Sequence, residues 1–297
     1  MSESMLSELL KISPKLSWMD GDTVRPYVYV RPENRITNPG ERFPLDWFSG
    51  KVIYKNPLQM KEVDFADQIL RLETACFSTS GMPMPRWVFY DCAIIPGFVA
   101  GFALKREKAS KEILEILQPG PDTEWLPISL FIIIPTMGPK EWVAHNLCSV
   151  NSLVSDTSKL YGVGFLTKAF ALWYANIEIC CGITQWNSPA VKLHTHYGDF
   201  EVLTAYTPVH SYARTLTYRL TVDPAEWKRF FTSQPSPDFT RRYESAGFEV
   251  EPAIDESLKI FQTMLESNKQ KYFLDSNQIR TQPLNSPLKV YKRRERN

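Results

Sequence analysis

An α/β fold, in which helices flank a mixed and mostly antiparallel sheet, is the fold class that the sequence predicts. Two stretches, Lys61–Phe77 and Lys159–Ala175, carry apolar residues at helical spacing. β-branched and aromatic runs bounded by turn residues lie between and after them, as expected for strands. Both ends of the chain lack this pattern. We therefore expect an irregular N-terminal arm over residues 1–58, an α/β domain over 59–221, and a helical C-terminal extension with a tail over 222–297.

The central domain is expected to run helix, two strands, two strands, helix, strand, helix and two strands. The corresponding ranges are 61–77, 86–95, 97–105, 124–134, 141–154, 159–175, 177–186, 187–198, 200–208 and 211–220. A short helical or looped insertion, residues 108–117, follows the first pair of strands.

The short helix predicted within 187–198 has clear boundary residues. Ser188 can cap it, Pro189 suits its first position, and Gly198 suits a left-handed residue after its end.

The arm and the extension are expected to differ in structure. The arm is rich in Pro, Asn, Asp and Gly, which predicts one or two short strands wrapped on the core. In the extension, residues 224–231, 237–247 and 254–273 are expected to be helical, and residues 278–297 show no core pattern.

Charge and hydropathy restrict the kinds of partner. The 34 Lys and Arg residues nearly cancel the 33 Asp and Glu residues, so no global field attracts nucleic acid or an anionic membrane. The N-terminus lacks the pattern of a secretory signal. The longest apolar run, Leu126–Ile134, is about half of the roughly 20 residues that a membrane helix needs. These features predict a soluble, cytoplasmic protein without a membrane partner.

The cysteines and histidines do not predict a metal site. Five cysteines form no CxxC pair, and the four histidines are scattered. Cys148 beside Ser149 raises the hypothesis of a nucleophile, but a buried strand cysteine is the favoured interpretation. We expect reduced, mostly buried thiols.

Gly162 and Gly164 stand at the start of a predicted helix. A P-loop would need the spacing GxxxxGK[ST], and a dinucleotide fingerprint would need Gly or Ala where the chain has Thr167. The remaining ligand hypothesis is a pyrophosphate held by the N–H groups of Val163 to Leu166, where the helix dipole favours negative charge. A plain strand-to-helix turn is the alternative.

The stretch KLYGVG, Lys159–Gly164, resembles the [Q/R]xxGx[G/A] loop of the GCN5-related N-acyltransferase (GNAT) superfamily, with Lys159 in place of Gln or Arg. The family's downstream pattern NxxAxxLYxxxGF is also partly present. Its matching residues are Asn187, Ala190, Leu193 and Gly198, whereas His194 replaces Tyr and Asp199 is inserted before Phe200. The element order matches over about residues 60–220, and the motifs match over about 159–200.

This resemblance implies a fold, a cofactor and a reaction. A GNAT-like protein uses acetyl-CoA or another acyl-CoA as co-substrate and transfers an acetyl or other short acyl group to an amine, which attacks the thioester directly. The resemblance assigns cofactor binding to Val150, Ser152, Val154, Lys159, Tyr161, Gly162, Val163, Gly164, Phe165 and Leu166, with Asn187 on the cofactor arm.

The acid that protonates the departing thiolate has two candidates. His194 takes the family's tyrosine position, and an imidazolium is a competent proton donor near neutral pH. Tyr197 lies three residues further and shares its helix face. A structural role in packing is the alternative for each.

The base is expected on the strand before the glycines. Glu141 and His145 are its titratable residues, and a period of two puts both on one face with Ser149. A cross-strand polar contact is the alternative for His145, and a water chain could replace either residue.

Three other functions compete with this one. An acyl carrier protein or a long-chain acyl group could be the donor, or the domain could bind without turnover, since Lys159 and His194 replace usual family residues. A DNA-modifying transferase using the basic tail KRRERN is the least favoured. The expected acceptor is an amine-bearing small molecule or protein, and the extensions could build its pocket or a subunit contact.

Overall fold

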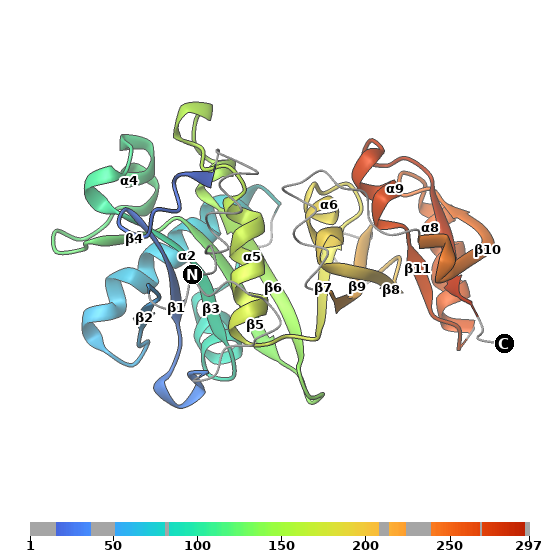
Figure 1. The fold of residues 1–297 in the computed structure, drawn as a ribbon, viewed down its shortest axis with the longest axis horizontal. Helices are drawn as coiled ribbons and strands as arrows, with labels where there is room; N and C mark the ends of the chain where they lie inside the picture. The colour runs from blue at the N-terminus through green and yellow to red at the C-terminus, as the bar shows by residue number, and fades with distance from the viewer. Residues whose placement is uncertain are drawn as a thin grey trace, which may run out of the picture. The chain divides into compact units, whose positions relative to one another are not determined.

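The computed structural model describes residues 16–36, 51–80, 83–207, 214–223, 239–267 and 269–294 (Figure 1). The chain forms two compact units, residues 1–177 and 178–297. Strands and helices occur in both.

In the first unit the strands follow the order β6-β5-β3-β1-β2, and β4 also pairs with β3. All neighbours are antiparallel except β1 and β2, which are parallel. The strands are β1 (Val24–Tyr29), β2 (Ile53–Lys55), β3 (Phe98–Lys105), β4 (Trp125–Pro127), β5 (Ser129–Pro135) and β6 (Glu141–Ser149). The arm contains the expected short strands, but because β1 is largely buried and pairs with β3 along its whole length, it belongs to the sheet itself instead of wrapping around it.

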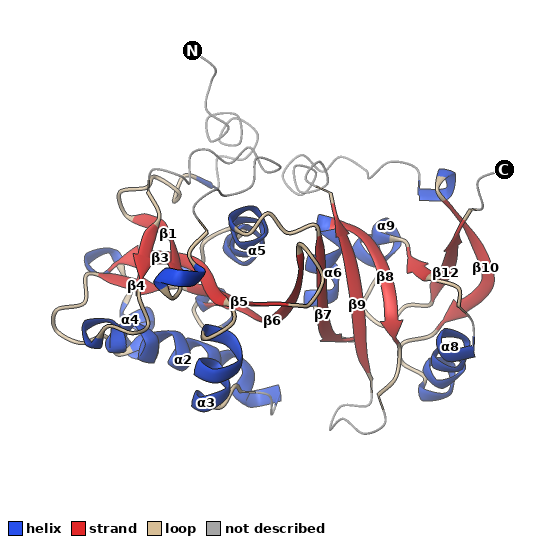
Figure 2. Cartoon of the chain, turned by 90° about the horizontal axis from the view of Figure 1, so that it is seen from below, coloured by secondary structure: helices blue, strands red, loops and turns tan. Residues whose placement is uncertain are grey.

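Helices lie on both faces of these strands (Figure 2). They are α2 (Val63–Phe77), α3 (Arg86–Val88), α4 (Lys111–Leu117) and α5 (Val163–Tyr174). Helix α2 buries one stripe, in which Phe65, Ile69 and Leu72 recur at helical spacing. Helix α5 is apolar nearly all round, and every residue after Gly164 is buried, as expected for a core helix.

The second unit has the strand order β10-β12-β11-β8-β9-β7, with antiparallel neighbours throughout. Its strands are β7 (Ile179–Gln185), β8 (Gly198–Thr204), β9 (Thr215–Val222), β10 (Tyr243–Val250), β11 (Tyr272–Leu274) and β12 (Leu288–Arg293). Its helices are α6 (Ala190–His194), α8 (Asp255–Ser267) and α9 (Ser276–Thr281). The predicted fold class, a mixed and mostly antiparallel sheet with helices, is confirmed.

Residues 86–95 were expected to be a strand, and this prediction is wrong. They form α3 and a π-helical turn, Phe89–Ile94. The buried residues Phe89, Ala93 and Ile94 lie four and five positions apart, which fits one side of a helix. A short apolar run of this length does not by itself distinguish helix from strand.

The C-terminal extension contains strands as well as the predicted helices. Of the expected helix 254–273, residues 255–267 form α8, whereas 272 and 273 belong to β11. Residues 243–250 and 288–293 form β10 and β12 instead of part of a helix and a loose tail. The strand β11 pairs with β8 and β12, so the extension continues the antiparallel sheet of this unit. The expected helix 224–231 lies outside the described residues.

The basic C-terminal cluster is partly paired. Lys292 forms a 3.1 Å ion pair with Glu244 on β10, and Arg294 lies 3.9 Å from the same carboxylate. These contacts explain why a charged segment can be a strand: its cations face a carboxylate on the neighbouring strand.

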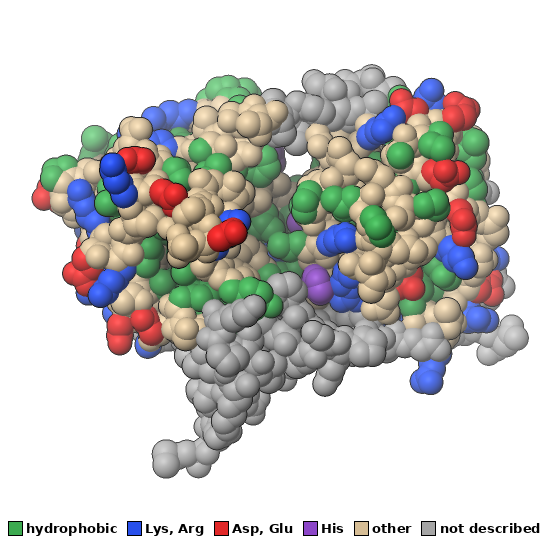
Figure 3. Space-filling model, turned by 90° about the horizontal axis from the view of Figure 1, so that it is seen from above, with side chains coloured by type: hydrophobic (Ala, Val, Ile, Leu, Met, Phe, Trp, Pro, Cys, Tyr) green, Lys and Arg blue, Asp and Glu red, His purple; other side chains and the backbone are tan. Residues whose placement is uncertain are grey.

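The described surface matches the balanced charge of the sequence. On the face that Figure 3 shows, acidic and basic side chains of the first unit are interspersed. Among the described residues, no helix combines the length and the apolar content needed to cross a bilayer.

Within the second unit, helix α9 contacts a histidine, His196, that must be neutral. An Arg280 N–H donates to Nδ1 of His196 over 3.1 Å, so this nitrogen carries no proton. Burial, reinforced by the Arg280 charge, lowers the pKa of His196 to about 4.

We predict an acid-sensitive contribution from His196. A histidine whose folded pKa is depressed stabilises the fold above its ordinary pKa of about 6.5, and this stabilisation falls away as pH drops towards 4. The loss should approach about 3 kcal/mol. Urea unfolding at pH 7.5 and 4.5 should show a smaller loss for His196→Asn, which keeps an acceptor but does not titrate. Equal losses in the variant and the parent would contradict this assignment.

Candidate active site

Strand β6 carries a β-bulge at the predicted catalytic position. Leu147 lies opposite Phe131 and Ala144 opposite Ile133, so three steps on β6 match two on β5. The extra residue belongs to the pair His145 and Asn146. A bulge of this kind re-aims side chains, and it changes which face each residue occupies.

The predicted common face of Glu141, His145 and Ser149 is therefore wrong. Ser149 and Ala144 lie opposite residues on the same face of β5, and Glu141 is an odd number of positions from Ala144. Glu141 and Ser149 thus lie on opposite faces. A sequence period of two cannot reveal the interruption.

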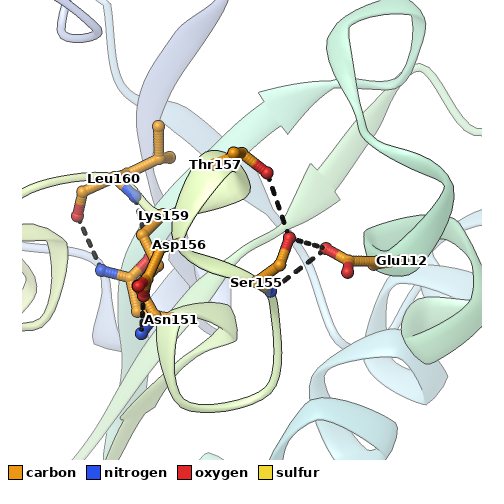
Figure 4. Close-up of polar contacts among 7 residues, drawn as sticks. All are labelled: Glu112, Asn151, Ser155, Asp156, Thr157, Lys159 and Leu160. Carbon is orange, nitrogen blue, oxygen red and sulfur yellow. Dashed lines mark hydrogen bonds and ion pairs between the residues drawn. The ribbon is translucent and has the colours of Figure 1, made fainter.

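The loop between β6 and α5 is closed by one side chain, that of Asn151. Its Nδ2 donates to the carbonyl of Leu160 over 2.7 Å, and its Oδ1 accepts from the Leu160 N–H at 2.9 Å (Figure 4). Two hydrogen bonds to one backbone unit fix both position and orientation. No period or motif in the sequence identifies Asn151.

The outer part of the same loop is braced by charged hydrogen bonds. The Glu112 carboxylate on α4 accepts from both the N–H and the hydroxyl of Ser155, at 3.2 and 3.0 Å (Figure 4). These bonds lower the pKa of Glu112. Lys159 lies 2.7 Å from Asp156, and its hydrogen bond and charge lower the pKa of that carboxyl. Lys159 keeps an exposed ammonium at the loop's end.

Gly162 is the residue from which α5 begins. Its φ of 73° and ψ of 6° are left-handed, a conformation that costs other residues energy. Its carbonyl accepts the first helical bond, from Leu166, and the N–H of Val163 donates to Leu160. The expectation of free N–H groups on Val163 and Leu166 is therefore wrong. Within the described part of the chain, the N–H of Gly164 has no acceptor.

The remaining residues predicted to bind the cofactor in the glycine loop differ in the burial of their side chains. Val163, Phe165 and Leu166 bury their side chains, so only their main chain could meet a ligand. Tyr161 is exposed, and its carbonyl accepts a 3.0 Å hydrogen bond from Trp18 of the arm.

The segment from Val150 to Val154 is a helical turn instead of the expected end of a strand. The N–H of Val150 donates to Ile128, and that of Val154 to Val150. These two amides are already bonded, so the predicted cofactor contact through them is not supported. The Ser152 hydroxyl donates to the carbonyl of Ser149.

A buried chain of hydroxyls fixes the first turn of α5. The hydroxyl of Thr167 lies 2.6 Å from that of Ser129 and 2.7 Å from the carbonyl of Val163. The Ser129 hydroxyl also accepts from the N–H of Phe102 on β3. The start of the helix is thus tied to two strands of the core.

His145 is exposed, and its Nδ1 lies 2.9 Å from Oδ1 of Asn146. Nearby, burial raises the pKa of Cys148, whose thiol therefore stays protonated. That state supports the packing interpretation of Cys148 over a nucleophilic one.

Asn187, His194 and Tyr197 belong to the second unit. Asn187 is exposed after β7, His194 is 6% exposed with its ring 4.8 Å from that of Tyr218, and Tyr197 is fully buried. Burial favours the packing alternative for Tyr197. The catalytic role of His194 stays a prediction.

The boundaries of α6 are partly as predicted. Ser188 caps its start by accepting from the N–H of Ala190 at 3.2 Å. Gly198 is not in the predicted αL conformation: its φ of 148° with a ψ of −161° is a different conformation, which residues with a Cβ also rarely adopt. It begins β8, where a Cβ would lie 1.9 Å from the carbonyl oxygen of Thr221, so close approach of the strands explains the glycine.

No protein-family model matches the sequence, and no curated protein matches it either. Several solved structures are similar over part of the chain. One is a chain of the NatC complex bound to Gag peptide and CoA, with 14% identity, 56% of this chain and 96% of that chain covered, and a TM-score of 0.36.

Two other similar structures are acetyltransferases. The acetyltransferase from Agrobacterium tumefaciens strain C58 has 14% identity, covers 55% of this chain and 86% of its own, and has a TM-score of 0.28. Nourseothricin acetyltransferase has 11% identity, coverages of 42% and 65%, and a TM-score of 0.27. At these identities and scores, the likenesses assign neither residue roles nor a substrate to this chain.

Replacing each of the two loop glycines by alanine should change the free energy of unfolding in opposite directions. Gly162→Ala must place a side chain in the left-handed region and should lower the free energy of unfolding by about 1 kcal/mol. Gly164→Ala lies inside the first turn of α5 and should raise it by up to about 1 kcal/mol. Urea denaturation of both variants measures the difference. Equal effects would refute the assigned backbone conformation.

Proposed function

We propose that this protein transfers an acetyl or other short acyl group from acyl-CoA to an amine, and that residues 151–164 hold the pyrophosphate of the CoA. The observation that carries the proposal is the left-handed Gly162 at the start of the buried helix α5, beside Gly164, whose N–H has no acceptor among the described residues. A helix N-terminus attracts phosphate through its dipole and its open N–H groups.

The clamped loop supports this proposal. Main-chain binding of a phosphate requires N–H groups that are already in place, because ordering a flexible loop would weaken binding. The Asn151 side chain, bonded twice to Leu160, and the Thr167 hydroxyl, bonded to Val163, hold the loop and the helix start in one arrangement. The ammonium of Lys159, which pairs with Asp156, is a further donor at the same end.

The chemistry requires a base and an acid. The base takes a proton from the ammonium of the acceptor, the amine attacks the thioester carbonyl carbon, and the C–S bond breaks as the thiolate leaves and is protonated. We propose His145 as the base because it is the exposed titratable residue at the bulge of β6. The candidate acids His194 and Tyr197 belong to the second unit, and we assign neither of them to this site.

Calorimetric titration should show saturable binding of CoA and acetyl-CoA, but not of NAD. Gly164→Val should weaken CoA binding at least about tenfold, because the branched side chain keeps phosphate away from the N–H of residue 164. Gly138→Val is the matched control: it lies in the turn between β5 and β6, where a Cβ meets the movable Glu141 side chain. Normal CoA binding by Gly164→Val would overturn the assigned site.

Turnover tests the second half of the proposal. With a panel of amines, release of free CoA thiol from acetyl-CoA should fall about 10²- to 10⁴-fold in His145→Gln, while CoA affinity stays unchanged. CoA binding without transfer to any amine would favour a binding module. No CoA binding at all would favour a donor such as acyl carrier protein.

A further inference from the structure

Three polar side chains from α2 and β6 form one hydrogen-bonded row. His145 Nδ1 lies 2.9 Å from Asn146 Oδ1, and Asn146 Nδ2 lies 2.5 Å from Glu73 Oε1. His145 is exposed, whereas Asn146 and Glu73 are buried. The row therefore runs from the surface of β6 into the interior of the first unit.

We infer that Asn146 and Glu73 are positioning residues that hold His145 as the Nδ1–H tautomer, leaving Nε2 open to accept a proton. The use of that proton acceptor rests on the proposed transferase function. The tautomer itself rests only on the hydrogen bonds of the row.

The polarity of the row can be followed from its buried end. The N–H of Met84 donates to Glu73 Oε1 at 2.8 Å, so this oxygen is an acceptor. The Asn146 atom facing the same oxygen must then be its amide nitrogen, which places Oδ1 towards His145. An amide oxygen only accepts, so His145 Nδ1 must donate. In the neutral ring, the proton is then absent from Nε2.

The bulge explains how neighbouring residues can form this bond. Consecutive side chains of a regular strand point to opposite faces and do not meet. His145 and Asn146 are the bulged pair of β6, where that alternation is interrupted. The Asn146 side chain turns to α2 while the imidazole stays exposed.

Glu73 is suited to a fixed role. It is 1% exposed, and burial raises its pKa against the opposing hydrogen bonds from Met84 and Asn146. When Glu73 is ionised, or protonated on Oε2, which has no hydrogen-bond partner among the described residues, Oε1 keeps its two donors. The constraint on Asn146 therefore does not depend on the charge of Glu73.

The exposed position of His145 makes such a constraint necessary for a base. A neutral histidine in water places its proton mainly on Nε2, the nitrogen that points away from the backbone. That tautomer could not accept a proton there. A hydrogen bond that engages Nδ1–H selects the other tautomer.

The test is nitrogen NMR of the full chain labelled with ¹⁵N-histidine. The sequence has four histidines, and His145→Gln identifies the signal of His145. At a pH where the ring is neutral, the parent should show a protonated Nδ1 and an unprotonated Nε2. Asn146→Leu and Glu73→Leu should move the proton towards Nε2.

Glu73→Gln is the matched control. Its carboxamide oxygen can still accept from both Met84 and Asn146, so the tautomer should be retained. If either leucine variant does not fold, Asn146→Ala is the replacement, and the signals of the other histidines report folding. In turnover, Asn146→Leu should lower kcat about tenfold or more at an unchanged KM for acetyl-CoA, less than the roughly 10⁴-fold cost of a wrong tautomer in a buried triad.

The outcomes separate the two proposals. An Nε2–H tautomer in the parent, or an unchanged tautomer in Asn146→Leu, overturns the inference whatever the turnover. The expected tautomer shift without acyl transfer by any form supports the row and overturns the proposed function alone.

Discussion

The buried hydroxyl of Ser129 ties together the elements on which the proposed site depends. It accepts from the N–H of Phe102 on β3 and lies 2.6 Å from the Thr167 hydroxyl on α5, which in turn reaches the carbonyl of Val163. The carbonyl of Ser129 also accepts from the Tyr27 hydroxyl on β1. Because buried polar groups are costly to leave unpaired, this set of bonds fixes the position of α5 along the strands that it covers.

The position of α5 fixes the loop that precedes it. The loop leaves β6 at Val150, whose N–H is bonded to Ile128, and enters α5 at the left-handed Gly162. Between these points Asn151 is bonded twice to Leu160. A main chain held at both ends and across its middle is a preorganised surface, which is what the recognition of phosphate by N–H groups requires.

Opposite faces of the same strands serve different parts of the proposed chemistry. Ser129 and Thr167 hold α5 on one face, while Glu73 on α2 contacts Asn146 from β6. The bulge at His145 and Asn146 connects the proposed base to the buried carboxylate of Glu73. Polar contacts in the core of the first unit thus both stabilise the packing of its helices and position the proposed base.

The sequence allowed prediction of the features that depend on local pattern. The helix α5, its glycine start and the run of strands around it follow from apolar spacing and glycine chemistry. The bulge in β6 could not be predicted, because it is defined by the register with β5. Likewise, Asn146 and Glu73 are 73 residues apart and meet only after α2 packs on β6.

The misassigned segments share a physical cause. Residues 86–94 and 243–250 lack a distinctive period, and each takes its structure from what it packs against or pairs with. The strand β10 alternates buried and exposed positions only in part and contains a register shift. The secondary structure of such segments is decided by tertiary packing and strand pairing, which cannot be read from a single sequence.

Hydrogen–deuterium exchange with and without CoA tests the central claim, that the main chain at the start of α5 holds the CoA phosphates. N–H groups that donate to a phosphate exchange more slowly, so saturating CoA should slow exchange in peptides covering residues 160–167. Peptides covering β1 and α2 of the same unit should change little. Slowed exchange elsewhere in the chain, with residues 160–167 unaffected, would contradict the account.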